Sequence, residues 1–296
     1  MRFHLFLPQM RMPLDAIVER ARAAEAAGFE GLALMDHLAP PMAAGHDMWE
    51  AMTAAAWLLA RTDSLVVGHL VLCDALRHPA VLARQAATLD HASGGRFELG
   101  IGSGSVPDEL DVFGVGRAPA RDRVARLGES LDVLRALWTG EPVTYGGRFF
   151  RLRGAQQRPV PTRRIPIVVG GVGERTLALV RAHADWWNVP IQSLDRLDDL
   201  RDRVGAARVS VQTMVGLVPS ERDRAAVTEV VARRFGGWAV GDALVVGTVD
   251  ELAAHFAMLG ARGVERSYVW FADFAPPATL ARFAEVIDAA AVTPSA

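Results

Sequence analysis

Residues 65–73 read LVVGHLVLC, and residues 96–104 read RFELGIGSG. Each is an apolar run of strand length, and residues 79–95 between them carry apolar side chains at helical spacing. Pro79 suits the first turn of this helix, where a missing N–H costs nothing, and Gly94 suits its end. The two runs therefore predict a strand, a helix and a second strand that ends in a glycine loop, which is the repeating unit of a parallel sheet.

The same alternation of strands and helices continues along the whole chain. Eight apolar runs, each followed by a helix, are predicted at residues 3–7, 31–35, 65–73, 97–101, 165–169, 186–191, 209–218 and 267–272. Eight such units in 296 residues favour an α/β fold whose strands close into a (β/α)8 TIM barrel, with residues 1–296 as a single domain. An open doubly wound sheet is the alternative.

Three segments need separate interpretation. Residues 139–164 break the rhythm before the fifth strand, and we interpret them as an insertion that holds a hairpin around residues 146–147. Residues 105–120 are predicted to form a long loop, and residues 194–204 a short helix.

The composition limits the classes of function. A net charge of −2 gives no broad attraction to nucleic acid or to a membrane surface, and no apolar run is long enough to predict a membrane span. All 32 basic residues are arginines, which excludes lysine Schiff-base chemistry. The single cysteine, Cys73, forms no internal disulfide, so we expect a cytoplasmic location.

The second predicted strand ends in Asp36 and His37. Active sites of TIM barrels lie at the carboxyl ends of the strands, and histidine titrates near neutral pH. The pair is therefore a candidate proton donor or acceptor, although an aspartate capping a helix beside an exposed histidine is the alternative. A metal site shared with His4 or His69 has little support because no closely spaced ligand pair is present, and we expect no metal.

Two short glycine loops follow the fourth and fifth predicted strands. They are Gly102, Ser103 and Gly104, and Gly170, Gly171, Val172 and Gly173. Backbone N–H groups at a helix start suit a phosphate, but neither loop has the lysine P-loop pattern or the full dinucleotide pattern. A tight turn would explain either loop alone, whereas two loops on adjacent strands favour a phosphorylated cofactor.

Two further side chains lie near these strand ends. Cys73 has no charged activator nearby in the sequence, so we interpret it as a small buried residue rather than a nucleophile. Met42, in the loop after the second strand, is expected to line a pocket.

Longer segments match one family in its own order along the chain. They are Asp36-His37, LRHPAVLA at 76–83, SGGRFELGIGSG at 93–104, PIVVGGVGER at 166–175, ADWWN at 184–188 and VGTVDEL at 246–252. Together they resemble the luciferase-like flavin and deazaflavin oxidoreductases of the bacterial luciferase superfamily. The resemblance implies a TIM barrel that binds FMN or coenzyme F420, a deazaflavin, at the C-terminal face.

The resemblance also implies roles for individual residues. Asp36 would lie beside the deazaflavin and His37 would serve in proton transfer, as in the F420-using branch. A non-prolyl cis peptide is implied near Leu70–Val71, against the ring. The loop Gly170–Gly173 would bind the cofactor phosphate, and Gly102–Gly104 with Asp108 would lie beside the ring.

One position departs from the family pattern. Ser105 stands where some F420-dependent dehydrogenases carry a catalytic glutamate directly after the glycines. The sequence leaves open whether Glu109, four residues further on, reaches the site. The departure speaks against a sugar-phosphate dehydrogenase.

These observations lead us to expect an F420-dependent oxidoreductase that moves a hydride between C5 of the deazaflavin and a small organic substrate. The resemblance suggests a homodimer, and an F420 or flavin reductase is a candidate partner. An FMN-dependent monooxygenase that uses O2 and reduced flavin is the first alternative. A non-catalytic flavin-binding barrel is the second, and a metal-dependent hydrolase is a distant third.

Overall fold

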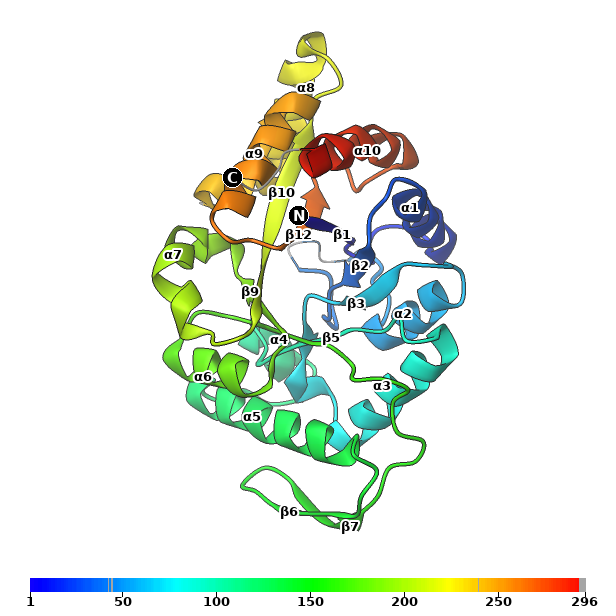
Figure 1. Ribbon diagram of the computed structural model, residues 1–296, viewed down its shortest axis with the longest axis vertical. Coiled ribbons are helices and arrows are strands. Elements are labelled where there is room, and N and C mark those ends of the chain that lie inside the picture. The colour runs from blue at the N-terminus through cyan, green and yellow to red at the C-terminus, as the bar shows by residue number, and fades with distance from the viewer. Residues whose placement is uncertain (42, 44, 239, 293–296) are drawn as a thin grey trace.

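The computed structural model describes residues 1–292 except 42, 44 and 239. Within them, nine parallel strands form a nearly closed barrel inside a ring of helices (Figure 1). The strands are β1 (Arg2–Phe6), β2 (Gly31–Leu34), β3 (Val66–His69), β4 (Leu72–Cys73), β5 (Leu99–Gly102), β8 (Ile167–Gly170), β9 (Trp186–Val189), β10 (Arg208–Leu217) and β12 (Arg266–Phe271). The predicted TIM barrel is confirmed.

The strands follow the order β3-β2-β1-β12-β10-β9-β8-β5-β4 around the barrel. β3 and β4 belong to one predicted strand, which is interrupted at the Leu70–Val71 peptide bond. β4 pairs with β5, and a bridge from Val67 of β3 to Phe97, just before β5, brings the two ends of the sheet together. All eight predicted strand positions are therefore present.

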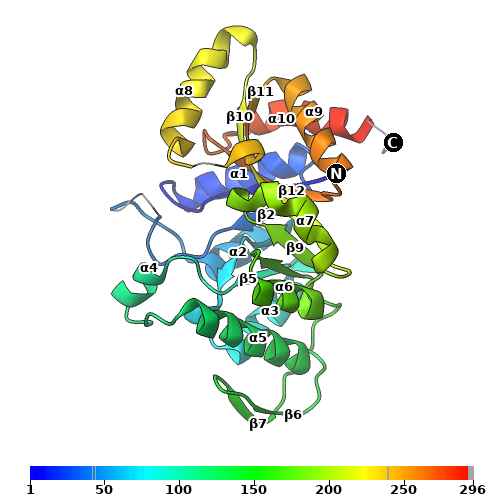
Figure 2. The same cartoon turned by 90° about the vertical axis from the view of Figure 1, so that its left-hand side faces the viewer.

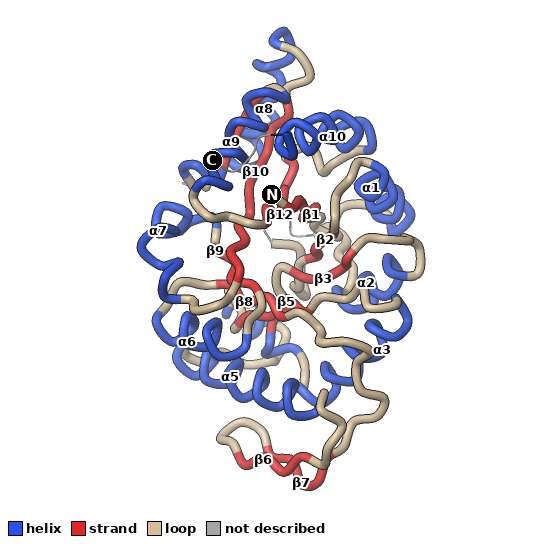
Figure 3. Tube along the Cα trace, in the orientation of Figure 1, coloured by secondary structure: helices blue, strands red, loops and turns tan. Residues whose placement is uncertain are grey.

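Helices surround the strands on all sides (Figure 3). They are α1 (Leu14–Ala26), α2 (Ala51–Leu59), α3 (Pro79–Ser93), α4 (Pro107–Val112), α5 (Ala120–Leu137), α6 (Glu174–His183), α7 (Leu197–Leu200), α8 (Arg224–Phe235), α9 (Val249–Ala261) and α10 (Pro277–Val292). Short 3₁₀ helices occupy Asp74–Leu76, Ile191–Arg196, Arg201–Arg203, Glu221–Asp223 and Gly241–Ala243. α3 begins at Pro79 and is capped at its C-terminal end by Gly94, which has a φ of 64°, as its sequence predicts.

The predicted hairpin lies outside the ring of helices. β6 (Val143–Gly146) and β7 (Arg151–Ala155) form an antiparallel pair at the end of the molecule opposite α8 (Figure 2). The Glu129 carboxylate on α5 accepts hydrogen bonds from the backbone N–H groups of Arg148, Phe149 and Phe150. These bonds fix the hairpin against the barrel.

Three local predictions were wrong. Residues 105–120 contain α4 rather than only a loop, and 194–204 form short 3₁₀ and α-helical turns instead of one helix. β11 (Leu244–Gly247), which we did not predict, pairs in parallel with the end of β10. β11 is as long as β2 or β5, but it lies off the path of barrel strands and pairs with the end of β10.

A buried polar cluster fills the barrel at the amino-terminal ends of the strands. Arg266 Nη1 donates to both carboxylate oxygens of Glu98, at 2.8 and 2.9 Å, and to the Tyr268 hydroxyl at 2.8 Å. Burial and then the Arg266 charge lower the pKa of His4 well below its usual value. Because each charged group here has a partner, the cluster serves as packing.

None of the helices in the described ranges combines the length and apolar character needed to span a bilayer.

Candidate functional site

A cavity of about 590 Å³ opens at the carboxyl ends of the barrel strands. This volume lies within the range of roughly 300–1,000 Å³ that is typical of small-molecule sites. Its lining includes Asp36, His37, Leu70, Val71, Gly102, Ser103, Gly104, Gly170 and Gly171 from the predicted site, together with Arg11, Cys73, Glu109, Arg233, Arg234, Trp238 and Trp270. Residues spread over most of the sequence thus meet in one place.

Some predicted site residues lie elsewhere. Asp108 is exposed, and its carboxylate lies 2.7 Å from the Arg117 guanidinium. Asp108, Val172 and Gly173 are absent from the described lining. We therefore do not retain Asp108 as a residue beside the ring. Val172 and Gly173 continue the Gly170–Gly171 loop toward α6. Met42 lies outside the described residues.

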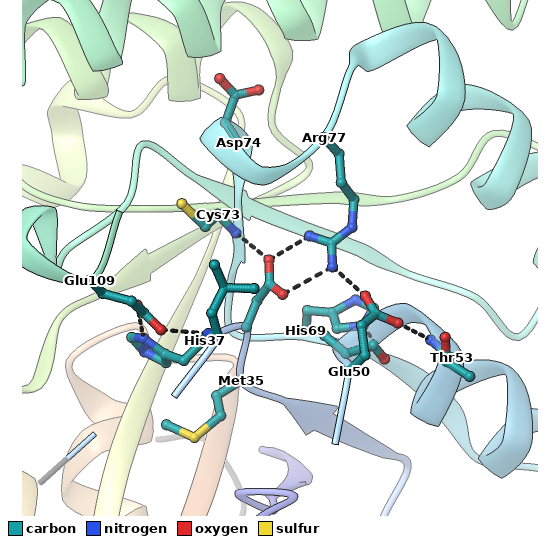
Figure 4. Close-up of polar contacts among 12 residues, drawn as sticks. Met35, His37, Glu50, Thr53, His69, Cys73, Asp74, Arg77 and Glu109 are labelled. Carbon is teal, nitrogen blue, oxygen red and sulfur yellow. Dashed lines mark hydrogen bonds and ion pairs between the residues drawn. The ribbon is translucent and has the colours of Figure 1, made fainter. Parts of the chain in front are cut away.

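His37 is held by Glu109. Its Nδ1 lies 2.8 Å from Glu109 Oε2, and both side chains are largely shielded, with 17% and 12% of their surfaces exposed (Figure 4). The other carboxylate oxygen of Glu109 accepts hydrogen bonds from the backbone N–H groups of Leu38 and Ala39. With Nδ1 donating to a carboxylate, the neutral imidazole carries its lone pair on Nε2. Glu109, whose reach the sequence left open, thus sets the orientation and tautomer of His37.

Asp36 is engaged in a different network. Arg77 donates to its two oxygens at 2.6 and 3.0 Å, and the Cys73 N–H donates at 2.8 Å. Arg77 also contacts Glu50 (Figure 4), whose pKa burial alone would raise but hydrogen bonds from Thr53 and Arg77 lower to about 2. The described hydrogen bonds do not join Asp36 to His37. Asp36 therefore fixes the backbone of β4 rather than the imidazole.

The chain before β4 presses against the glycines of β5. The Leu70–Val71 peptide is cis, at the position that the resemblance implied. A Cβ on Gly102 would lie 2.6 Å from the Val71 side chain, and one on Gly104 would lie 2.9 Å from Cys73 Sγ. Gly104 also has a φ of +83°, which disfavours other residues. These glycines are therefore required by close packing at the cavity wall.

Cys73 lines the cavity beside Gly104. Burial raises the pKa of its thiol, so the neutral form dominates at neutral pH. A neutral thiol agrees with the interpretation of Cys73 as a packing residue rather than a nucleophile.

The loop after β8 offers bare backbone to the cavity. A Cβ on Gly170 would meet nothing closer than 3.7 Å, and Gly171 has a φ of +129°. Trp187 Nε1 donates to the Gly171 carbonyl at 2.8 Å and holds the loop in place. The space at Gly170 is a place where a ligand can approach the backbone closely. Apolar walls at Leu70 and Val71, with this cradle nearby, fit a flat ring that carries a phosphorylated tail.

The cavity wall across the barrel from the glycine loops was not predicted from the sequence. Arg11 follows β1, Arg233 and Arg234 lie on α8, and Trp270 is on β12. The adjacent pair Arg233–Arg234 was visible in the sequence, but two arginines near the end of a helix are commonly a solvated feature.

The histidines considered as metal partners serve other purposes. His4 is buried within the cluster at the bottom of the barrel. His69 is buried with Nε2 3.2 Å from the Ala51 carbonyl, and burial lowers its pKa to about 4. The described ranges hold no group of three or more His, Cys, Asp or Glu side chains arranged for a metal ion.

A model of the luciferase-like monooxygenase family matches residues 1–266. The chain belongs to this family. The family resemblance inferred from the sequence motifs is therefore confirmed.

Curated relatives include F420-dependent enzymes. An F420-dependent glucose-6-phosphate dehydrogenase of Mycolicibacterium fortuitum is 37% identical over 162 residues, covering 53% of this chain and 47% of the relative. A protein of the same name from Microbacterium testaceum is 33% identical over 205 residues, covering 65% of this chain and 60% of the relative. The chain thus spans between 47% and 60% of the length of these two relatives.

Several solved structures share the fold. An F420-dependent secondary alcohol dehydrogenase in complex with an F420-acetone adduct has a TM-score of 0.84 and 19% identity over 98% of each chain. A monooxygenase from Streptomyces bottropensis has a TM-score of 0.78 and 22% identity over 97% of this chain and 98% of that chain. At these identities, the similarity establishes the barrel.

Proposed function

We propose that this protein is a coenzyme F420-dependent oxidoreductase that transfers a hydride between C5 of the deazaflavin and a small organic substrate. The observation that carries the proposal is the His37–Glu109 pair at the wall of the 590 Å³ cavity, which the backbones of Gly102–Gly104 and Gly170–Gly171 also line. The names of the Mycolicibacterium fortuitum and Microbacterium testaceum relatives support F420 as the cofactor.

The cavity offers a wall for each part of the cofactor. Leu70, Val71 and the Gly102–Gly104 segment would contact the ring, since they bring apolar groups and backbone together at one wall. The Gly170–Gly173 loop would hold the phosphate through backbone N–H groups. Bound F420 supplies a two-electron carrier whose C5 donates or accepts hydride. The protein then has to orient the substrate and manage one proton.

His37 is the group proposed to manage that proton. Oxidation of an alcohol, or reduction of a carbonyl, C=C or C=N bond by hydride, moves one proton off or onto the substrate. His37 Nε2 takes or gives it, because Nδ1 is committed to Glu109. Glu109 stabilises the imidazolium that forms on proton uptake. Asp36 contributes by fixing β4 through its Cys73 contact.

Anaerobic turnover tests this function. The purified protein is given oxidised F420 with a panel of small alcohols and sugar phosphates, or reduced F420 with carbonyl and imine compounds, and deazaflavin absorbance is followed. We expect turnover with at least one class and no need for oxygen. Turnover only with reduced FMN and O2 would overturn the proposal and support the monooxygenase alternative. No turnover with either cofactor would support a binding protein.

The assembly and partners expected from the sequence remain proposals. We propose a homodimer that receives reduced cofactor from a separate reductase, and sedimentation of the purified protein tests the first part.

A further inference from the structure

We propose that the cavity contains a subsite for an oxyanion of the substrate, either phosphate or carboxylate, formed by Arg11, Arg233 and Arg234. This inference rests on the proposed function for its substrate, because it assigns the arginines to the molecule that exchanges hydride with the cofactor. It makes the substrate an acid rather than a neutral alcohol or ketone.

Two of the guanidinium groups share one aromatic platform. The Arg234 Cζ lies 3.4 Å from the centroid of the Phe274 ring, and the Arg11 Cζ lies 5.7 Å from the same centroid. Cation–π contact holds each group in place without neutralising its charge. Two cations held on one ring repel each other, and an anion bound between them relieves that repulsion.

The platform itself is fixed by hydrogen bonds. Arg20 Nε donates to the Phe274 carbonyl at 2.8 Å. The Asp273 carboxylate accepts from the Ala275 N–H at 3.0 Å and from the Thr279 hydroxyl at 2.6 Å. Phe274 and Ala275 both have positive φ values, of 64° and 54°. This turn after β12 is thus held in a specific conformation, which aims the ring at the arginines.

The three arginines have no counter-ion among the described residues: no ion pair joins Arg11, Arg233 or Arg234 to a carboxylate there. Arg77, which follows β4, instead contacts both Asp36 and Glu50. Arg234 Nη2 and Trp270 Nε1 are buried and lack a hydrogen-bond partner within the described ranges. Unpaired buried donors cost free energy, and a bound oxyanion accepts from both.

The Arg234 guanidinium nevertheless stays charged at neutral pH. Burial, and to a lesser extent the charge of Arg11, lower its pKa to about 10. A guanidinium that is still protonated but poorly compensated binds anions more strongly than one at the surface.

The position of the arginines in the barrel assigns them to the substrate. Arg11 follows β1, the neighbour of β2, and β2 leads to His37. Arg234 contacts Trp270 of β12, the other neighbour of β1. The glycine loops follow β5 and β8, which lie across the barrel in the strand order. The arginines are therefore near the proton-transfer group and opposite the loops proposed for the cofactor.

Anion binding measured without turnover tests the subsite. Inorganic phosphate and, separately, acetate are titrated into the protein with and without saturating F420, and tryptophan fluorescence is followed because Trp238 and Trp270 line the cavity. We expect one anion to bind in both conditions. Arg234→Gln and Arg11→Gln should each weaken it about tenfold or more, a loss of about 1.4 kcal/mol. Arg234→Lys, which keeps the charge, should recover part of the affinity.

Arg222→Gln is the matched control, because Arg222 precedes α8 with 88% of its side chain exposed. The Arg222→Gln variant should bind the anion with the affinity of the wild type. If Arg234→Gln fails to fold, Arg233→Gln replaces it, since Arg233 is exposed on α8.

Three results would overturn the subsite. They are binding of neither anion by the wild type, equal binding by wild type and arginine variants, and competition between phosphate and F420 with F420 affinity lost in Arg234→Gln. The last would assign the arginines to the anionic tail of the cofactor. Anion binding that depends on Arg234 in a protein that does not bind F420 would instead refute the proposed function and leave the anion site standing.

Discussion

Glu109 Oε2 lies 2.8 Å from Nδ1 of His37, although 72 residues separate the two in the sequence. Because Glu109 lies in the first turn of α4 and also accepts backbone N–H groups after His37, it ties that helix to the loop after β2. This one carboxylate thus joins the orientation of the imidazole to the shape of the cavity mouth.

Loss of either partner should lower turnover without removing the cofactor. His37→Ala should reduce kcat by about 10²–10⁴, the usual contribution of general acid–base catalysis, with F420 affinity kept. Glu109→Gln should cause a smaller loss of kcat, because the imidazolium that forms on proton uptake loses its counter-charge. Asp108→Asn, on the same short helix but exposed, is the control and should behave as wild type. Wild-type kcat in the Glu109→Gln variant would refute the role of Glu109 in supporting His37.

Arg77→Gln should destabilise the fold by about 3–5 kcal/mol, because it leaves the buried Asp36 carboxylate without a counter-charge. Only 3% of the Asp36 side chain is exposed. Urea unfolding of the variant and of the double variant Asp36→Asn/Arg77→Gln measures this, and the double variant should recover part of the loss. A cost for Arg77→Gln no greater than that of an exposed ion pair would show that Asp36 is not held in this way.

His69 should make stability fall in mild acid. Its pKa is about 4 in the fold, where burial disfavours the charged form, against 6.5 for an exposed histidine. As the pH falls, this histidine therefore takes up a proton in the unfolded chain before it does so in the fold. The stability that neutral His69 contributes is complete above pH 6.5 and is lost as pH falls toward 4. Between pH 7 and 5 this amounts to about 2 kcal/mol. His69→Gln should show a pH dependence of urea unfolding that is shallower by that amount, and an unchanged slope would contradict it.

Gly170→Val should fold normally but bind F420 at least about tenfold more weakly, a loss of about 1.4 kcal/mol. The reason is that a Cβ at Gly170 has free space in the cavity, with nothing closer than 3.7 Å. Gly146→Val on β6, where a Cβ would also meet nothing within 4 Å, is the matched control outside the cavity. Unchanged affinity in Gly170→Val, with normal thermal unfolding, would place the cofactor elsewhere.

The barrel was predictable because each strand is a local apolar run and each helix carries local end signals. α4 was within reach too, since Pro107 and the acidic residues after it form a helix start. The positions of the glycine loops and of His37 were also predictable, because these residues come directly after strands. β11 is an apolar run of the same kind, but it pairs with the end of β10 off the path of barrel strands, so the repeat of strands and helices did not indicate it.

The contacts that define the site are of another kind. Glu109 with His37, and Arg77 with Asp36, join residues 72 and 41 positions apart. Arg11 and Arg234 both lie over the ring of Phe274, although the three residues are far apart in the sequence. No spacing rule in a single sequence identifies such pairs, since they depend on how the strands are ordered around the barrel.

Whether F420 is the cofactor is tested by an equilibrium titration of the purified wild-type protein with F420 and, separately, with FMN, followed by fluorescence. We predict tight binding of F420 and much weaker binding of FMN. Tight binding of FMN with weak binding of F420, or binding of neither, would contradict it.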